Sequence, residues 1–451
     1  MPIDPNVLRE HATDVARRLG VVGAQVAVLD GAATTAVSVG VENAESNVPT
    51  TDDTLFQIGS TTKVFTAALV MQLVDEERID LDTPVAHYLP EIRFADVEAT
   101  RSITPRQLMS MGSGLDNGPY TDHGPGPDAV RRYVEALSDL PQVFAPGSGY
   151  SYSNASTVVS GYLVERLTGM EWDRALRERL LDPAGVPGMV TLPDDVIHRR
   201  FAVGHVRAEN GNVQVLHARP MPRAIGPAGS TLWSTATDLV RFARTFLDGG
   251  LEVLSAAAVD AMHAPQIAVP PTLLADHWGL GPYRKTWDGV VLHGHSGTTT
   301  YGSSYLLWVP SKGFAIATVV NTPTVGYPFV DEIFARVLPD LCSVHVPDKP
   351  KPVEGLSLET DRLVGTYTMS DSTITVTADG AGGVLASIES SFESRPLSAP
   401  SPLLPISPTV FLASDPMIDG GRGWGLAFLG TEEGPATHLV NGFFAMRRKT
   451  T

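Results

Sequence analysis

The amino-acid sequence predicts a large α/β domain, with an antiparallel sheet flanked by helices and a helical subdomain, followed by a small all-β barrel. Strand-like segments lie near both ends of residues 1–345 and enclose a helical middle, which favours a sheet assembled from both ends of that region. The stretch VPDKPKPVEG at 346–355 carries three prolines and no apolar periodicity, so it indicates a stiff linker. Short alternating runs then fill residues 356–451, which is typical of a small antiparallel barrel.

Composition excludes several classes of function. A length of 451 residues suggests two or more domains. The composition, 43% hydrophobic and 18% charged, is typical of a globular protein. A formal net charge of -17 disfavours binding to nucleic acid or an anionic membrane. The first residues are partly acidic and lack an apolar core of signal-peptide length, and no later apolar run reaches about 18 residues. We therefore expect a cytoplasmic protein.

Changes in hydrophobic period predict the first elements. Ala24–Leu29 and Ala36–Val41 alternate around DGAA and indicate a hairpin, and Leu55–Ile58 indicates a short strand. Apolar residues then recur at helical spacing from 64 to 74, and Pro84 limits this helix.

The rest of the chain predicts helices first and strands afterwards. The expected helices are Pro105–Met111, Pro127–Leu137, Ser156–Arg166, Trp172–Leu180, Thr235–Leu247 and Phe329–Leu341. The expected strands of the large domain are Gly289–His293, Gly302–Val309 and Phe314–Asn321. The barrel should contain Thr373–Thr377, Val384–Ile388, Val410–Ala413, Gly425–Leu429 and His438–Val440, and no helix.

Cysteine and histidine usage gives no sign of a cofactor. The one cysteine, Cys342, excludes an internal disulfide and a cysteine-clustered metal site, and its apolar surroundings predict a buried thiol. The twelve histidines are scattered, and no phosphate loop or dinucleotide fingerprint occurs. We expect no metal, nucleotide or redox cofactor.

The stretch IGSTTKVF places Ser60 three residues before Lys63, at the start of the first long helix. Serine is a common helix N-cap, so this pattern alone fits a cap as well as a nucleophile. Positions i and i+3 share a helix face, however, so the Lys63 amine can reach the Ser60 hydroxyl. Burial among apolar neighbours would lower the lysine pKa towards that of a useful base.

Two further motifs could serve the same serine. In PGSGYSYSNAS, the Tyr152 phenol can act as a base and then as an acid. The Asn154 amide can hold the substrate and the lysine. A half-buried aromatic is the alternative for Tyr152, and Tyr150 lacks the asparagine two residues later.

In HGHSGTTT, His295 precedes Gly297, which permits close backbone approach. The Thr298 and Ser60 amides could then stabilise an oxyanion, although a polar turn remains the simpler alternative. His293 is the weaker candidate, because no Ser-Gly follows it.

Together, Ser60–Lys63, Tyr152–Asn154 and His295–Gly297 resemble the three motifs of the penicillin-binding protein and class C β-lactamase superfamily of active-site serine enzymes. The resemblance covers about residues 5–340 and implies a mixed sheet with a helical subdomain, and the site between them. It implies that Ser60 is the acylated nucleophile and Lys63 its base. It also implies that Tyr152 is the second acid/base, Asn154 a positioning group, and His295 the group facing the far side of the substrate.

Two departures from that family stand out. His295 occupies a slot in which the family has lysine, so a fixed cation is replaced by a ring whose unperturbed pKa is near 6.5, and carboxylate recognition is weakened. Met111-Gly112 stands where relatives often have His-Thr, which changes the local hydrogen bonding.

The motifs leave the fate of an acyl-enzyme open. Penicillin-binding-protein-type thioesterases, which release and cyclise nonribosomal peptides, typically carry one lipocalin-like barrel, and LVGTY at Leu363–Tyr367 resembles its opening strand. This resemblance implies a peptidyl thioester, held by the carrier protein of a peptide synthetase, as substrate. Similar tails occur on hydrolases of the superfamily, so a D-stereospecific peptidase or esterase acting on a small ester or peptide remains the alternative. The third possible function is that of a binding module that kept the fold and lost the chemistry. The presence of Ser60, Lys63 and Tyr152 argues against it.

The chain ends with NGFFAMRRKT, which supplies one last hypothesis. The simple interpretation is a solvated basic terminus. Alternatively, Arg447 or Arg448 on the last barrel strand reaches the cleft and binds a carboxylate or the peptide main chain.

Overall fold

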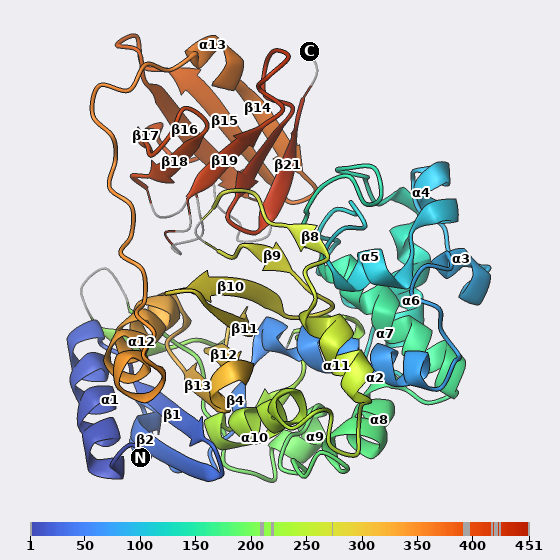
Figure 1. The fold of residues 1–451 in the computed structure, drawn as a ribbon, viewed down its shortest axis with the longest axis vertical. Coiled ribbons are helices and arrows are strands. Elements are labelled where there is room, and N and C mark those ends of the chain that lie inside the picture. Colours follow the sequence, from blue (N-terminus) through green and yellow to red (C-terminus); the bar gives the residue numbers. More distant parts are fainter. Residues whose placement is uncertain are drawn as a thin grey trace.

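A nine-stranded antiparallel sheet forms the centre of the large domain in the computed structural model (Figure 1). The model describes residues 2–207, 212–217, 221–272, 274–390, 397–415, 418, 423 and 425–449. In spatial order the strands are β3 (Val48–Pro49), β2 (Ala33–Asn43), β1 (Gly23–Asp30), β13 (Phe314–Val320), β12 (Ser303–Val309), β11 (Val290–Thr298), β10 (Tyr283–Trp287), β9 (His277–Trp278) and β8 (Ile267–Ala268). Two small pairs lie outside it: β4 (Phe56–Gln57) with β7 (Trp233–Ser234), and β5 (His205–Arg207) with β6 (Val213–Val215).

Both ends of the domain contribute to the sheet, as the sequence predicted. The register pairs Ala24 of β1 with Val320 of β13, and Asp30 with Phe314. Strand residues alternate between two buried faces. Ala315 and Ala317 belong to one core with Phe242, whereas Ile316 belongs to a second core.

Helices cover both faces of this sheet. The helices of the large domain are α1 (Pro5–Leu19), α2 (Thr62–Asp75), α3 (Val85–Tyr88), α4 (Val97–Ser102), α5 (Pro105–Met109), α6 (Ala129–Glu135), α7 (Asn154–Thr168), α8 (Trp172–Ala175), α9 (Pro193–Val196), α10 (Ala236–Leu247), α11 (Ala256–His263) and α12 (Gly326–Cys342). Helices α1 and α12 pack together on one face, and α10 packs on the other against β1 and β13. Helix α2, which is apolar on all sides, is buried between the sheet and the helical subdomain.

Helix α1 was not anticipated from the hydrophobic pattern. Its end signals are nevertheless present, because the Asp4 side chain caps the Asn6 amide and Gly20 ends the helix in the left-handed conformation. Within α12, Cys342 is buried, as expected, and burial raises the pKa of its thiol to about 11.

The second domain is a closed antiparallel barrel with its own core. Its strands are β14 (Gly365–Met369), β15 (Ser372–Ala378), β16 (Val384–Ser390), β17 (Ser401–Pro405), β18 (Val410–Ala413), β19 (Leu426–Leu429), β20 (His438–Asn441) and β21 (Phe444–Arg448). Closure comes from pairing of β14 with β21. The expectation of no helix was wrong, since α13 (Thr360–Leu363) makes one turn before β14 and buries Leu363 in the barrel core.

The barrel packs against the large domain at the end of the sheet formed by β9 and the edge strand β8, and the linker follows one side of the molecule (Figure 1). Its Ser370 amide donates to Asp116 Oδ2 at 2.9 Å. His438 on β20 stacks on Phe144 with ring centroids 4.0 Å apart, and its Nε2 lies 3.0 Å from the Val143 carbonyl oxygen. The barrel therefore contacts the segments before and within the loop that carries Tyr152.

Candidate active site

Ser60 lies in a short 3-10 turn, Gly59–Thr61, that runs directly into α2. The turn is held from the sheet, because Ser304 Oγ donates to the Ile58 carbonyl at 2.6 Å and lies 2.7 Å from Thr61 Oγ1. Gly59 has φ +56°, a conformation that favours glycine. Gly59 adopts this turn without strain, and hydrogen bonds from β12 hold the turn in place. Together they fix the position of Ser60.

The N-cap interpretation of Ser60 was wrong. The N-cap positions of the turn and of α2 belong to Ile58 and Thr61, and neither makes a side-chain cap hydrogen bond. The Ser60 hydroxyl instead faces Lys63, whose Nζ lies 3.1 Å away. A serine at this position is therefore oriented towards an amine and does not cap the helix.

Lys63 is buried, with 1% of its surface exposed. Its Nζ donates to Asn154 Oδ1 at 2.6 Å and to the Ala228 carbonyl at 2.7 Å. No carboxylate is among its hydrogen-bond partners in the described chain, and desolvation lowers the pKa of Lys63 well below 10.5. Burial therefore shifts Lys63 towards the neutral form, compared with an exposed lysine.

The three partners of a neutral Lys63 determine where its lone pair points. A neutral amine has two N–H groups and one lone pair, and the two carbonyl oxygens of Asn154 and Ala228 can only accept. They take both hydrogens. The lone pair is left for the Ser60 hydroxyl, which is the orientation that a general base for that hydroxyl requires.

Asn154 begins α7 and links Lys63 to a residue that sequence reasoning missed. Its Oδ1 accepts from Lys63 while its Nδ2 donates to the Tyr120 hydroxyl at 2.8 Å. The N-cap of α7 is Ser153, whose side chain accepts from the Ser156 amide. Tyr120 thus holds the Asn154 amide in place with its oxygen towards the lysine.

Replacing Tyr120 by phenylalanine is expected to lower kcat about tenfold, because losing one hydrogen bond of about 1.4 kcal/mol frees the Asn154 amide to rotate away from Lys63. Steady-state kinetics with an activated ester measures this. Tyr133→Phe is the matched control, since the buried Tyr133 hydroxyl has no hydrogen-bond partner in the described structure. Equal kcat in both variants would contradict the positioning role of Tyr120.

Tyr152 is buried beside Lys63, with the lysine Nζ 4.9 Å from its ring centroid. The ring packs against Trp278 at 5.7 Å and against Phe443, from the barrel, at 4.8 Å. The structure therefore brings Ser60, Lys63, Asn154 and Tyr152 together, as the sequence predicted. Trp278 and Phe443 gave no signal in sequence, because isolated aromatic residues are more often core.

His295 is fully buried on β11, where its pKa departs from the unperturbed histidine value near 6.5. Desolvation and the nearby Lys63 lower its pKa to about 3. Its Nδ1 lies 2.6 Å from the Ser296 carbonyl oxygen, which can only accept, so Nδ1 carries the proton. Its Nε2 is then an acceptor, with no partner in the described structure. This neutral ring offers no cation to a carboxylate, and its Nε2 is buried in the described structure.

Gly297 lies against the turn that carries Ser60. A β-carbon at this position would come 1.9 Å from the Ile58 carbonyl oxygen and 2.6 Å from the Ser60 amide nitrogen, so only glycine fits. The Thr298 nitrogen lies close to Gly59, 2.8 Å from where a β-carbon would stand. The Ser60 and Thr298 amides thus belong to adjoining backbone segments, the arrangement that an oxyanion site needs.

The departure at Met111 has a local explanation. Met111 has φ +59°, its sulfur accepts from the Ser153 amide at 3.4 Å, and its carbonyl accepts from the Ser151 amide at 2.9 Å. It is buried in the same core as Tyr152 and Trp278. Methionine therefore supports the Tyr152 loop by a weak acceptor and by packing.

Arg447 lies exposed on β21, opposite His438 and Thr368 in the barrel register. Arg448 donates to the Arg362 carbonyl at 3.3 Å and lies over the Tyr367 ring. It is the hairpin before them, at Phe443 and Phe444, that contacts Tyr152.

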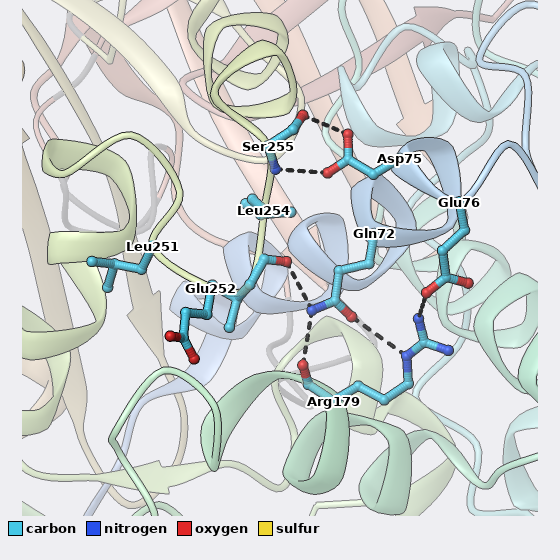
Figure 2. A pocket seen from close by; sticks show the side chains of 9 residues that line it. Gln72, Asp75, Glu76, Arg179, Leu251, Glu252, Leu254 and Ser255 are labelled. Atoms are coloured by element: carbon cyan, nitrogen blue, oxygen red, sulfur yellow. Dashed lines mark hydrogen bonds and ion pairs between the residues drawn. The ribbon is translucent and has the colours of Figure 1, made fainter.

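A surface hollow of about 610 Å³ lies at the opposite end of α2 (Figure 2). Asp75 accepts from Ser255, and Glu76 is paired with Arg179, so these carboxylates are already occupied. None of the partners of Lys63 lines this hollow. The hollow is therefore separate from the cluster around Ser60 and Lys63.

Across the described ranges, no group of three or more His, Cys, Asp or Glu side chains could hold a metal ion. In the same part of the chain, no helix has both the length and the apolar character needed to cross a membrane.

Comparisons with known proteins agree with this architecture. The chain matches the family model described as Beta-lactamase over residues 8–337. Penicillin-binding protein 4 from Amycolatopsis lactamdurans is 36% identical over 376 residues, covering 81% of this chain and 98% of that protein.

Two solved structures are also similar. SurE has a TM-score of 0.80 at 29% identity, covering 99% of each chain, and its structure with D-Leu has a TM-score of 0.78. A D-stereospecific amidohydrolase from Streptomyces sp. has a TM-score of 0.60 at 25% identity, covering 76% of this chain and 100% of that one.

The fold and its comparisons define a class of enzyme, the serine hydrolases and acyltransferases. The chain belongs to the beta-lactamase family, and penicillin-binding proteins are among its homologues. The likeness to SurE extends over both domains, the barrel included.

Proposed function

We propose that this enzyme forms an acyl-enzyme at Ser60 and passes the acyl group to an amine of the same peptide, so that a thioester-bound nonribosomal peptide is released as a ring. The observation that carries the acyl-transfer step is the buried Lys63, whose Nζ lies 3.1 Å from Ser60 Oγ and whose two other partners are obligate acceptors. The full-length likeness to SurE, including the barrel, supports the two-domain architecture on which the resemblance to thioesterases rests. The D-Leu in one SurE structure supports a D residue at the reacting carbonyl.

In the acylation half-reaction, Lys63 accepts the Ser60 proton as Oγ attacks the thioester carbonyl carbon. The oxyanion is stabilised by the Ser60 and Thr298 amides. The C–S bond breaks, the thiolate leaves with a proton delivered through Tyr152, and the ester to Ser60 remains.

In the second half-reaction the peptide amine attacks this ester. Tyr152 or Lys63 takes the amine proton, the C–O bond breaks, and Ser60 Oγ recovers a proton as the amide forms. His295 stays neutral in this scheme and supplies no cation to the substrate. Aromatic walls around Tyr152 favour ring closure over hydrolysis, because they exclude water while the tethered amine stays at high effective concentration.

Product analysis tests the proposal. Purified enzyme is incubated with a linear peptidyl thioester that ends in a D residue and carries a free amine, and products are separated by mass spectrometry. Cyclic peptide is the expected main product, and a small synthetic thioester should replace the carrier protein as donor. Linear acid as the sole product would contradict cyclisation, but it would still agree with an acyl-enzyme at Ser60.

Hydrolysis by a D-stereospecific peptidase or esterase is the second candidate. The structural likeness to a D-stereospecific amidohydrolase, which lies in the large domain, supports it. A library of D and L esters and amides separates the two functions, since a hydrolase should release acid from short substrates that have no amine able to close a ring.

We further propose that Arg447 binds a substrate carboxylate or main-chain oxygen from the rim of the barrel. Arg447→Ala should then weaken turnover of carboxylate-bearing substrates a few-fold through KM, while neutral esters are unaffected. Arg448→Ala is the control, because Arg448 is already engaged with Arg362 and Tyr367. Unchanged turnover of every substrate by Arg447→Ala would end this proposal.

A further inference from the structure

The turn between β20 and β21, residues Asn441–Phe444, brings barrel residues against the candidate acid/base; we call it the barrel hairpin. The Tyr152 amide donates to the Phe443 carbonyl at 3.3 Å. The rings of Phe443 and Phe444 lie 4.8 Å and 5.7 Å from the Tyr152 ring. The site is therefore completed by a second domain.

Several contacts hold the barrel hairpin in place. Gly442 turns it with φ +82°, and its carbonyl oxygen lies 3.5 Å from Thr272 Oγ1. Behind the turn, Val440 and Ala445 form a small apolar cluster with Val143, at the base of the loop that leads to Tyr152. Docking of the barrel and placement of the Tyr152 loop are thus one packing arrangement.

The two phenylalanines occupy different environments. Phe443 is 4% exposed and packs between Tyr152 and Trp278, so its ring supports Tyr152 and has little surface left for substrate. Phe444 is half-buried and meets the Tyr152 ring in an edge arrangement. Phe444 therefore keeps apolar surface open beside the reacting groups.

The wall around Tyr152 is apolar on the other sides as well. Trp278, Tyr150 and Met111 belong to the same buried core as Phe443. The nearest titratable ring, His295, is neutral, and desolvation favours the neutral form of Lys63. A charged side chain placed here would lose its hydration without a partner.

We propose that the barrel hairpin forms a side-chain subsite for the residue that carries the reacting carbonyl: Phe444 contacts an apolar or aromatic side chain, and Phe443 is a positioning residue that holds Tyr152. This inference rests on the proposed acyl transfer at Ser60 and adds the chemistry of the side chain accepted. Apolar pockets of this kind discriminate side chains by about 10- to 200-fold.

Matched thioesters of N-acetyl-D-phenylalanine, N-acetyl-D-alanine and N-acetyl-D-glutamate test the subsite. Wild type should prefer phenylalanine over alanine by at least about tenfold in kcat/KM and use glutamate least. Phe444→Ala should reduce the phenylalanine-to-alanine ratio at least about threefold. Leu404→Ala, at an exposed leucine on β17 of the same domain, should leave the ratio unchanged.

Phe443→Ala tests the positioning role. It should lower kcat for all three thioesters with little change in KM, and Phe443→Tyr, which keeps the ring, should recover most of kcat. Thermal unfolding confirms that each variant is folded. If Phe443→Ala does not fold, the same kinetics are measured on Phe443→Leu, because leucine removes the aromatic contact while largely keeping the side-chain volume.

A fluorophosphonate probe separates the two levels of the hypothesis. Labelling of wild type with an unchanged substrate ratio in Phe444→Ala overturns the subsite alone. Full kcat in a folded Phe443→Ala or Phe443→Leu variant overturns the positioning role. If wild type is not labelled and turns over none of the thioesters, the proposed function fails and the subsite fails with it.

Discussion

Replacing Ser60 by alanine is expected to abolish acyl-enzyme formation and to lower turnover by on the order of 10³- to 10⁶-fold, as loss of a catalytic nucleophile does. The physical reason is that, among the partners of Lys63 in the described part of the chain, the Ser60 hydroxyl is the one group able to donate to the lysine lone pair. Covalent labelling by a fluorophosphonate or a penicillin probe, read by intact-protein mass spectrometry, measures acylation directly, and ester turnover measures the rate.

Thr62→Ala provides a control in the same segment. The Thr62 hydroxyl donates to the Gly59 carbonyl at 2.7 Å and so supports the turn without facing Lys63. It should remain labelled, with a modest loss of rate. Labelling of Ser60→Ala at full stoichiometry would place the nucleophile elsewhere, and a wild type that resists every probe would revive a binding role for this fold.

Replacing Lys63 by methionine is expected to lower the acylation rate at least about 10³-fold while Ser60 is still present. Methionine nearly preserves the volume but removes the lone pair that accepts the serine proton. Single-turnover kinetics with an activated ester gives this rate. Lys285→Met is the matched control, because Lys285 is a second buried lysine, on β10, whose Nζ donates to the Tyr305 hydroxyl.

The same variant tests the charge state of Lys63 through stability. The pKa of Lys63 is lowered in the folded protein, so between that value and 10.5 the unfolded chain binds the extra proton. The resulting penalty is absent above pH 10.5, grows as the pH falls, and is complete below the folded pKa. As the pH increases through this window, the free energy of unfolding of wild type should therefore rise relative to that of Lys63→Met by about 1.4 kcal/mol per pH unit.

Urea unfolding of both proteins at several pH values between 8 and 10 measures that slope. Comparing differences between the two proteins cancels the titration of all groups they share. Parallel curves would mean that Lys63 keeps its ordinary pKa in the folded state. It would then be an ammonium at neutral pH and would need another group to deprotonate Ser60.

The hydrophobic pattern predicted the fold class because its causes are local. The strands that became β1, β2, β12 and β13, and the long helix that became α2, are set by residues a few positions apart. Helix α1 was missed although Asp4 and Gly20 mark its ends and its buried residues Leu8, Ala12, Val15 and Ala16 recur at helical spacing. The one-turn helix α13 was missed because four residues are too few to show a helical period.

The candidate site divides in the same way. Contact between Ser60 and Lys63 follows from helical spacing of three residues, and the motifs at Tyr152, Asn154, His295 and Gly297 were visible as residue types. The charge state of His295 was not visible in the residue types. The residue type supplies only the unperturbed histidine pKa near 6.5, whereas burial lowers the pKa of His295 to about 3 and leaves its ring neutral.

The sequence alone thus determined the two-part architecture, the serine with its lysine, and the enzyme class they belong to. Only the tertiary structure decided which groups take the two hydrogens of Lys63, how Tyr120 orients Asn154, and that Phe443 and Phe444 come from the barrel to meet Tyr152. These contacts join segments about 30 to 290 residues apart, and the pKa values depend on how fully those segments exclude water. Neither long-range contact nor desolvation is encoded in the neighbours of a residue along the chain, so both emerge only when the chain has folded.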